Sequence, residues 1–234
     1  MNRIYTFILC GMVMGIFFGV ASFTYAAEPQ FLVSWKSLVY APNWYEGKLI
    51  PTKDSVVQVS FELVDQDGVN KGKVVNVSAS EVRWYIGTTM VQKGIGLQTI
   101  TIKNNLFSNA TIPVKISVDF SNQRTGEKYF VEKYIHIPVT ERRLILTRPW
   151  MDHTLTPHTQ ATWYAIPFFF SSDPRSLNLT WTVNGQVVNP TSDDPFSLSI
   201  QSGDAGQTVD IEASLGNSES LWDTASAFER IYIQ

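Results

Sequence analysis

The 234-residue sequence has few of the side chains on which catalytic and metal sites depend. It contains one cysteine, Cys10, and three histidines. Cys10 lies in an apolar N-terminal segment, so the remainder of the chain has no thiol. Disulfides, thiolate metal sites and cysteine nucleophiles are thereby excluded from that remainder.

Lysine is absent from the second half of the chain. Residues 27–140 carry 12 basic and 10 acidic side chains, whereas residues 141–234 carry 5 and 11. No run of Lys and Arg stands out, so we expect no nucleic-acid partner. The asymmetry has two interpretations: drift between two related halves, or a slightly basic first half near an anionic surface with an acidic second half projecting away.

The motifs of common enzymes and metal sites are also missing. There is no Gly-x-Ser-x-Gly elbow and no His–Cys pair for nucleophilic catalysis. His153 and His158 are five residues apart in a proline-containing loop, which is not the spacing of a helical zinc site, and His136 lies in an alternating strand pattern. Asp65-Gln66-Asp67-Gly68 starts like a calcium loop but lacks the later ligands, so a turn explains it better. We expect no enzyme, no metal and no cofactor.

The N-terminus has the pattern of an export signal. Asn2-Arg3 is positive, residues 4–20 are almost continuously apolar, and Thr24-Tyr25-Ala26 offers small residues for cleavage after Ala26. We therefore predict that residues 1–26 are a signal peptide. An uncleaved membrane anchor is the alternative, because residues 4–25 match the roughly 20 residues of a spanning helix.

Export without disulfides favours a bacterial envelope over a eukaryotic secretory route. We expect the protein to be extracellular or in the cell envelope, with membrane anchorage if the N-terminal helix is retained.

The chain repeats itself. Val82-Arg83-Trp84-Tyr85-Ile86 returns as Leu179-Thr180-Trp181-Thr182-Val183, with the tryptophans 97 residues apart, and Glu132 and Glu229 are also 97 residues apart. This period predicts two related domains, at 27–140 and 141–234. The boundary near Thr140 has no Gly/Ser tract, so we expect a semi-rigid rod.

Apolar and polar residues alternate within each predicted domain. Residues 57–63, 100–102 and 112–118 have period two in the first, as do residues 198–200 and 209–215 in the second. Period two is typical of half-buried antiparallel strands. Asn184-Gly185 is a strong hairpin signal. The pattern predicts an all-β chain.

The segments around the repeated tryptophans resemble strand C of an immunoglobulin-like domain. The closer match is Thr180-Trp181-Thr182-Val183-Asn184-Gly185-Gln186-Val187. The resemblance implies two tandem β-sandwiches of about 100 residues, each with a buried tryptophan. The chain lacks the two cysteines of antibody domains and the Trp-x-Phe-Gly-Asp-Gly run of PKD domains, so it is most similar to bacterial immunoglobulin-like (Ig/PKD-like) domains.

The start of the predicted mature chain carries a narrower resemblance. Val33-Ser34-Trp35-Lys36 and Tyr40-Ala41-Pro42-Asn43-Trp44-Tyr45-Glu46-Gly47 are similar to predicted exported surface proteins of uncultivated bacterial lineages. This resemblance implies the same architecture and leaves the function open.

Aromatic residues are concentrated in loops. Tyr40, Trp44 and Tyr45 share one proline-bearing loop, and Trp150 and Thr162-Trp163-Tyr164 are candidate counterparts in the second repeat. Such rings either seal a sandwich end or a domain contact, or form a surface for a sugar or a partner protein. We predict Trp44, Tyr45, Tyr40 and Trp150 as binding residues, and Trp84 and Trp181 as core.

These features favour a non-enzymatic envelope protein with a structural or adhesive role and a surface or envelope protein as partner. The alternative is a carbohydrate-binding module at the cell wall or beside a separate enzyme.

Overall fold

The structure is a computed structural model that describes residues 28–66, 70–121, 128–150, 152–190, 192–217 and 220–234. The predicted signal or anchor, 1–26, lies outside these residues. Within the described ranges, no helix is both long and apolar enough to cross a membrane.

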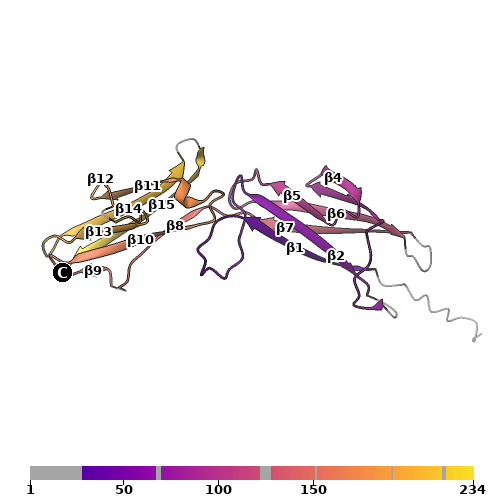
Figure 1. Cartoon of the computed structure of the whole chain (residues 1–234), viewed down its shortest axis with the longest axis horizontal. Helices are drawn as coiled ribbons and strands as arrows, with labels where there is room; N and C mark the ends of the chain where they lie inside the picture. Colours follow the sequence, from indigo (N-terminus) through magenta and orange to yellow (C-terminus); the bar gives the residue numbers. More distant parts are fainter. Residues whose placement is uncertain (1–27, 67–69, 122–127, 151, 191, 218–219) are drawn as a thin grey trace, which may run out of the picture.

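The first sandwich consists of two antiparallel sheets (Figure 1). One has the order β1-β2-β5, made of β1 (Gln30–Leu38), β2 (Val56–Val64) and β5 (Thr99–Lys103). The other has the order β4-β3-β6-β7, made of β3 (Glu81–Ile86), β4 (Thr89–Ile95), β6 (Thr111–Ser121) and β7 (Lys128–Pro138).

The second sandwich repeats this arrangement. One sheet has the order β13-β10-β8, made of β8 (Arg143–Thr147), β10 (Gln160–Phe168) and β13 (Ser197–Gln201). The other has the order β12-β11-β14-β15-β9, made of β9 (Thr154–Leu155), β11 (Asn178–Val183), β12 (Gln186–Val188), β14 (Thr208–Asn217) and β15 (Ser220–Ile233). The two-residue β9 runs parallel to β15.

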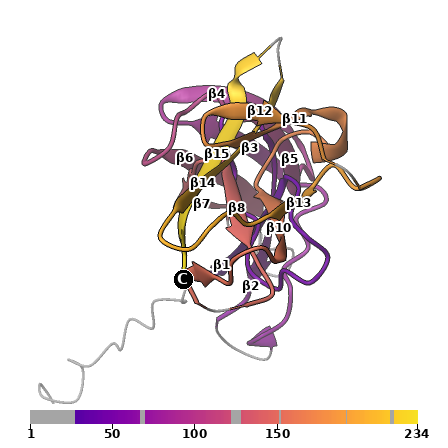
Figure 2. The ribbon, with the colours of Figure 1, turned by 90° about the vertical axis from the view of Figure 1, so that its left-hand side faces the viewer.

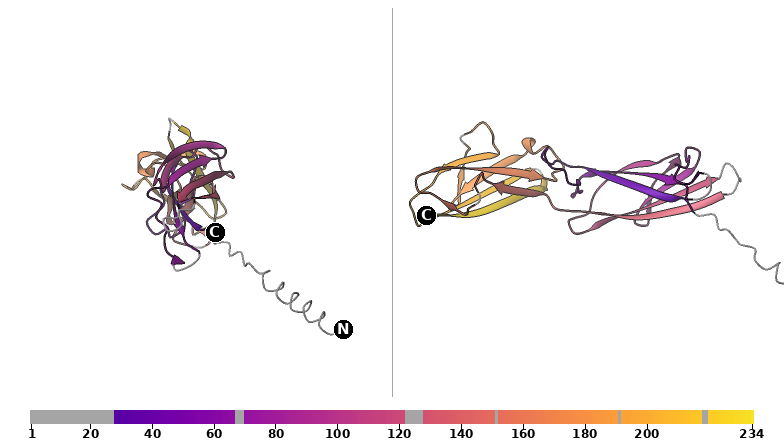
Figure 3. Two further views of the ribbon diagram at one scale, coloured as in Figure 1. Left: turned by 90° about the vertical axis from the view of Figure 1, so that its right-hand side faces the viewer. Right: turned by 90° about the horizontal axis from the view of Figure 1, so that it is seen from below.

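The expected all-β, immunoglobulin-like fold is confirmed by this strand order. If the two-residue β9 is left out, the first, second and fifth strands of each half form one sheet and the other four strands form the second. β9 is added at one edge of the second sheet of the second half. The two halves lie end to end (Figures 1 and 3). Each buries its own apolar cluster, one formed between Phe31 and Val139 and the other between Leu144 and Ile233.

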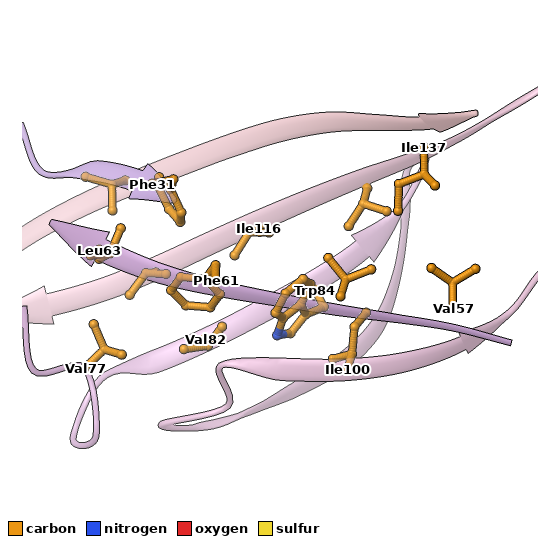
Figure 4. Close-up of a cluster of buried hydrophobic side chains, with 14 of the residues drawn as sticks. Phe31, Val57, Phe61, Leu63, Val77, Val82, Trp84, Ile100, Ile116 and Ile137 are labelled. Atoms are coloured by element: carbon orange, nitrogen blue, oxygen red, sulfur yellow. The ribbon is translucent and has the colours of Figure 1, made fainter. Parts of the chain in front are cut away.

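The repeated tryptophans are at the centre of these clusters. Trp84 and Trp181 are fully buried, and their indole N–H groups donate to the carbonyls of Leu97 at 2.8 Å and Pro195 at 2.9 Å. Figure 4 shows Trp84 beside Phe61 of the opposite sheet, and the centroids of the two rings are 5.6 Å apart. Each tryptophan therefore joins the two sheets of its own sandwich and satisfies its one polar atom.

The two glutamates of the sequence repeat are not structurally equivalent. Trp84 pairs with Ile116 and Trp181 with Ala213, which keeps the offset of 97. On the next strand Ile116 pairs with Lys133 but Ala213 pairs with Ala227, so the offset falls to 94. Glu132 consequently faces outward, whereas Glu229 lies on the core side. The prediction of equivalence at this position was wrong.

The hairpin predicted at Asn184-Gly185 joins β11 to β12. Both residues have positive φ, 48° and 77°, as a two-residue type I′ turn requires. The first sandwich uses Gly87, with φ 60°, at the matching turn.

Candidate functional site

The loop between β1 and β2 leaves the first sandwich and packs against the second. The Tyr40 N–H donates to the Phe170 carbonyl and the Phe169 N–H donates to the Tyr40 carbonyl, both at 2.7 Å. The Thr52 hydroxyl donates to the Phe169 carbonyl at 3.0 Å. Phe169 has φ 63°, a conformation that exposes its backbone groups to the loop. The aromatic loop predicted from the sequence is therefore part of the junction between the sandwiches.

Three consecutive phenylalanines form the other side of this junction. Phe170 is fully buried in the core of the second sandwich, while Phe168 and Phe169 turn toward the loop. Tyr45 meets Phe168 and Phe169 edge-on, with ring centroids 5.5 and 5.8 Å away. Trp44 meets Phe168 edge-on at 5.8 Å. Tyr45 is a packing residue, whereas Trp44 touches the cluster by one edge and remains 65% exposed.

A buried ion pair fixes the chain between the sandwiches. The Arg142 guanidinium pairs with Asp223 of β15, and the two side chains are only 6% and 7% exposed. Arg142 also donates to the Lys53 carbonyl at 2.7 Å. Asp223 accepts from Ser171 and Ser172 at 3.3 and 3.1 Å. This network links the β1–β2 loop, the linker and the last strand.

A hollow of ≈ 210 Å³ opens beside Trp44. We call it the junction groove. One wall belongs to the β1–β2 loop and the other to β10 and the loops beside it. The lining side chains include Tyr40, Pro42, Trp44, Pro167, Arg175 and Asp194.

The floor of the groove contains Pro167, which lies in the central strand β10. The Ala165 N–H donates to the Phe196 carbonyl, so the nitrogen two residues further along, that of Pro167, faces the same side. β13 begins at Ser197, opposite Tyr164, and so leaves this side of Pro167 uncovered. Proline is tolerated where no ladder hydrogen bond is required. The floor therefore offers no N–H donor at Pro167, which leaves recognition to the side chains of the walls.

The two charged residues of the groove are held by local turns. Pro174–Ser176 forms a short 3₁₀ turn whose cap, Asp173, accepts from the Arg175 N–H at 3.0 Å. The Asp194 carboxylate accepts from the Phe196 N–H at 3.0 Å. These turns place Arg175 and Asp194 in the lining of the groove that Trp44 also borders.

Trp150 lies elsewhere. It packs on Trp163 in a T-shaped contact, with ring centroids 5.2 Å apart, and borders a hollow of ≈ 480 Å³ that also includes Gln234. The C-terminus marks this end of the second sandwich, away from the first (Figure 1). The structure thus brings Tyr40, Trp44 and Tyr45 together and places Trp150 at a separate site.

Trp163, considered as a surface aromatic from the sequence, is fully buried. Its indole donates to the Glu229 carboxylate at 3.0 Å, and Glu229 pairs with Arg148. Burial lowers the pKa of Arg148 from its usual range. This cluster stabilises the edge of the second sandwich.

The histidines lie apart from the junction groove. The Nε2 atom of His158 lies 3.4 Å from Asp204, and the Nδ1 atom of His153 lies 3.7 Å from Glu229. Across the described ranges, no group of three or more His, Cys, Asp or Glu side chains is placed to hold a metal ion.

One wall of the groove has no signature in the sequence. Pro167, Arg175 and Asp194 belong to three separate segments, and none forms a motif. The only available signal was the run Ile166-Pro167-Phe168-Phe169-Phe170, which is longer than an alternating strand requires.

No protein-family model matches the chain, and no curated protein matches its sequence. Solved structures similar to it include the fibronectin(III)-like modules of CbhA from Clostridium thermocellum, at 10% identity and a TM-score of 0.29, covering 87% of this chain and 94% of that one. Murine CEACAM1b has 12% identity and a TM-score of 0.29, with 87% and 100% covered. A chimeric titin Z1Z2 has 10% identity and a TM-score of 0.34, with 90% and 99% covered. At this level no property of those proteins transfers to the chain.

Proposed function

We propose that the chain is a non-enzymatic cell-envelope protein, exported or tethered through residues 1–26, with a structural and adhesive role. Its junction groove would bind a segment of another envelope or surface protein. The observation that carries this proposal is Trp44, a large ring at the rim of a groove that stays mostly exposed although its edge is held in place.

An exposed, fixed tryptophan is suited to recognition. Because its contact with Phe168 already restricts the ring, burying it against a partner costs little additional side-chain entropy. Tryptophan and arginine are the residues most enriched among binding hot spots. Trp44 and Arg175 border the same groove.

The groove favours a partner's side chain over a whole cofactor. Its ≈ 210 Å³ is below the roughly 300–1,000 Å³ of typical small-molecule pockets. Because Pro167 offers no N–H there, an added β-strand would find an incomplete ladder. A protruding apolar or aromatic side chain fits the rings, and Arg175 and Asp194 can orient the polar atoms around it.

The second candidate is a carbohydrate-binding module. An open indole face beside a carboxylate and a guanidinium also suits a sugar ring, which stacks on the indole and hydrogen-bonds at its edge. Such a module would act at the cell wall or beside a separate enzyme.

Binding to envelope fractions of the producing cell separates the two candidates. Immobilised fractions are left intact, treated with protease or treated with periodate, and then probed with the purified chain. We expect Trp44→Ala to weaken binding to the intact fraction by about 30-fold, the effect of losing one hot spot. Protease, and not periodate, should abolish the wild-type signal.

Phe228→Ala is the matched control, because Phe228 is an exposed aromatic outside the groove. Loss with periodate alone supports the carbohydrate candidate instead. Equal binding by wild type and Trp44→Ala rejects the groove for both.

A further inference from the structure

The outer face of the sheet β4-β3-β6-β7 carries exposed apolar side chains on both of its edge strands. Outward residues of adjacent strands form rows, because paired residues lie on the same face. One row reads Met90, Tyr85, Lys115, Tyr134; the next Lys93, Arg83, Ser117, Glu132; the third Ile95, Glu81, Asp119, Phe130. We call these three rows the row face.

The apolar residues of the row face are well exposed. Met90 and Ile95 on β4 are 51% and 65% exposed, and Tyr134 and Phe130 on β7 are 61% and 57% exposed. They are on the outside of a sandwich that buries its core fully on the opposite side of the same sheet. These four side chains occupy the ends of the first and third rows, with the charged and polar side chains of the row face between them.

Polar side chains between the apolar columns are fixed by contacts to one another. Arg83 pairs with both Glu81 and Asp119. Glu132 accepts from Ser117 at 2.7 Å and from Lys115 at 3.1 Å. Three cations balance three carboxylates, so the row face has no net charge. An anionic surface or polymer is therefore a poor partner for it.

The corresponding face of the second sandwich is built differently. The row equivalent to Met90–Tyr134 is Val187, Thr182, Glu212, Phe228. The next two rows contain Thr180, Ser214 and Ser226, then Asn178, Gly216 and Thr224, without a charge or a large apolar residue. The row face is thus not a general property of the fold.

We infer that the row face is the contact between two copies of the chain. The two-fold axis lies between the two facing sheets, parallel to the strands and midway between β3 and β6. Rotation about this axis places β4 of one copy over β7 of the other, so that each row faces the same row of the second copy. Met90 then faces Tyr134, and Ile95 faces Phe130. Between them Lys93 faces Glu132, and each contact occurs twice, as an isologous interface requires.

The inner columns agree with the same axis. Lys115, whose ammonium lies 4.3 Å from the centroid of its own Tyr85 ring, faces Tyr85 of the second copy. Glu81 faces Asp119, but Arg83 of each copy already pairs with both carboxylates. Under this one operation the apolar edge positions, the Lys93–Glu132 pair and the Lys115–Tyr85 pair are complementary, and only the Glu81–Asp119 positions bring like charges together.

The test is the mass of the full chain in solution against concentration, in detergent if residues 1–26 are retained. We expect a dimer for wild type. Lys93→Glu and Glu132→Lys should each raise the dimer dissociation constant roughly tenfold or more, since both copies of the contact become repulsive. An equimolar mixture of the two variants should restore the dimer, because each acidic face meets a basic one.

Tyr134→Ser should weaken the dimer, and Phe228→Ser, at the matching position of the second sandwich, should leave it unchanged. Thermal unfolding shows that each variant is folded, and recovery in the mixture demonstrates it independently. A monomer at every concentration, a mixture that stays monomeric, or equal effects at Tyr134 and Phe228 would each overturn the inference. Association through residues 1–26 alone would not respond to Lys93→Glu and would also overturn it.

Discussion

Three tryptophans show how position decides the role of one residue type. Trp84 and Trp181 join the sheets of their sandwiches and donate to loop carbonyls, so they contribute to stability. Trp44 has comparable apolar area but leaves most of it exposed at the junction groove. We propose that it contributes to binding.

Replacing either core tryptophan should unfold the sandwich that contains it. Trp84→Ala and Trp181→Ala remove a fully buried ring and should each cost about 3–5 kcal/mol in the free energy of unfolding. Trp44→Ala should change it by less than about 0.5 kcal/mol. Urea unfolding measures all three, and wild-type stability in either core variant would refute the strand C assignment.

Glu132 should make the stability of the first sandwich sensitive to acid. The Ser117 hydrogen bond, followed by that of Lys115, lowers the pKa of Glu132 from its usual range. A carboxylate with a lower pKa in the folded state stabilises the fold at neutral pH, and this contribution is lost as the pH falls through the folded pKa. Glu132→Gln should flatten the decline of stability between about pH 5 and pH 3. Urea unfolding of the dilute chain at each pH checks this, and an unchanged slope would contradict it.

Strands and turns were predictable because their signals are local. The alternation in residues 57–63 and 209–215 falls within β2 and β14, and Asn184-Gly185 forms the turn between β11 and β12. The register of the last strand in each half was not predictable from the sequence, because the connection between β6 and β7 is longer than the connection between β14 and β15. As a result, Glu132 and Glu229 share the 97-residue spacing of the repeat although they occupy non-equivalent positions in the two sandwiches.

One wall of the junction groove, the β1–β2 loop, was predictable because its signal is also local. Tyr40, Trp44 and Tyr45 form a local excess of aromatic residues, whereas their packing partners Phe168 and Phe169 lie more than a hundred residues away. The three consecutive phenylalanine rings lie in different environments. Phe168 and Phe169 pack in the junction, whereas Phe170 is buried in the core of the second sandwich. No periodic pattern encodes such a division.

The hairpin at Gly185 offers a test at this scale. Its φ of 77° suits glycine, and an added Cβ would meet nothing within 4 Å, so the effect of Gly185→Ala comes from the backbone alone. We expect a loss of about 1–2 kcal/mol in the second sandwich. Gly94→Ala, where φ is not positive, is the control. A neutral Gly185→Ala would contradict the assigned turn.

At the scale of the whole molecule, the chain is a rod of two sandwiches in line. Figure 2 views the rod along its long axis, and the right panel of Figure 3 shows the two halves one after the other along that axis. The junction combines a backbone bridge at Tyr40, the aromatic contacts of the β1–β2 loop and the Arg142–Asp223 pair. We expect these contacts to stiffen the junction, as the short linker predicts.

Removing one member of the buried pair should loosen the rod. Asp223→Ala would leave the Arg142 guanidinium buried without its carboxylate, at a cost of about 3–5 kcal/mol. Small-angle scattering should then show a broader distribution of interatomic distances than for wild type. An unchanged distribution with unchanged stability would show that this pair does not hold the junction.

We propose above that the junction groove binds a partner protein in the cell envelope. The most direct test replaces Trp44 by a photo-crosslinking phenylalanine derivative in the producing cell, with the same replacement at Phe228 as control. We expect a covalent adduct between the chain and another protein from position 44 and not from position 228. No adduct at position 44, or the same adducts from both positions, would contradict it.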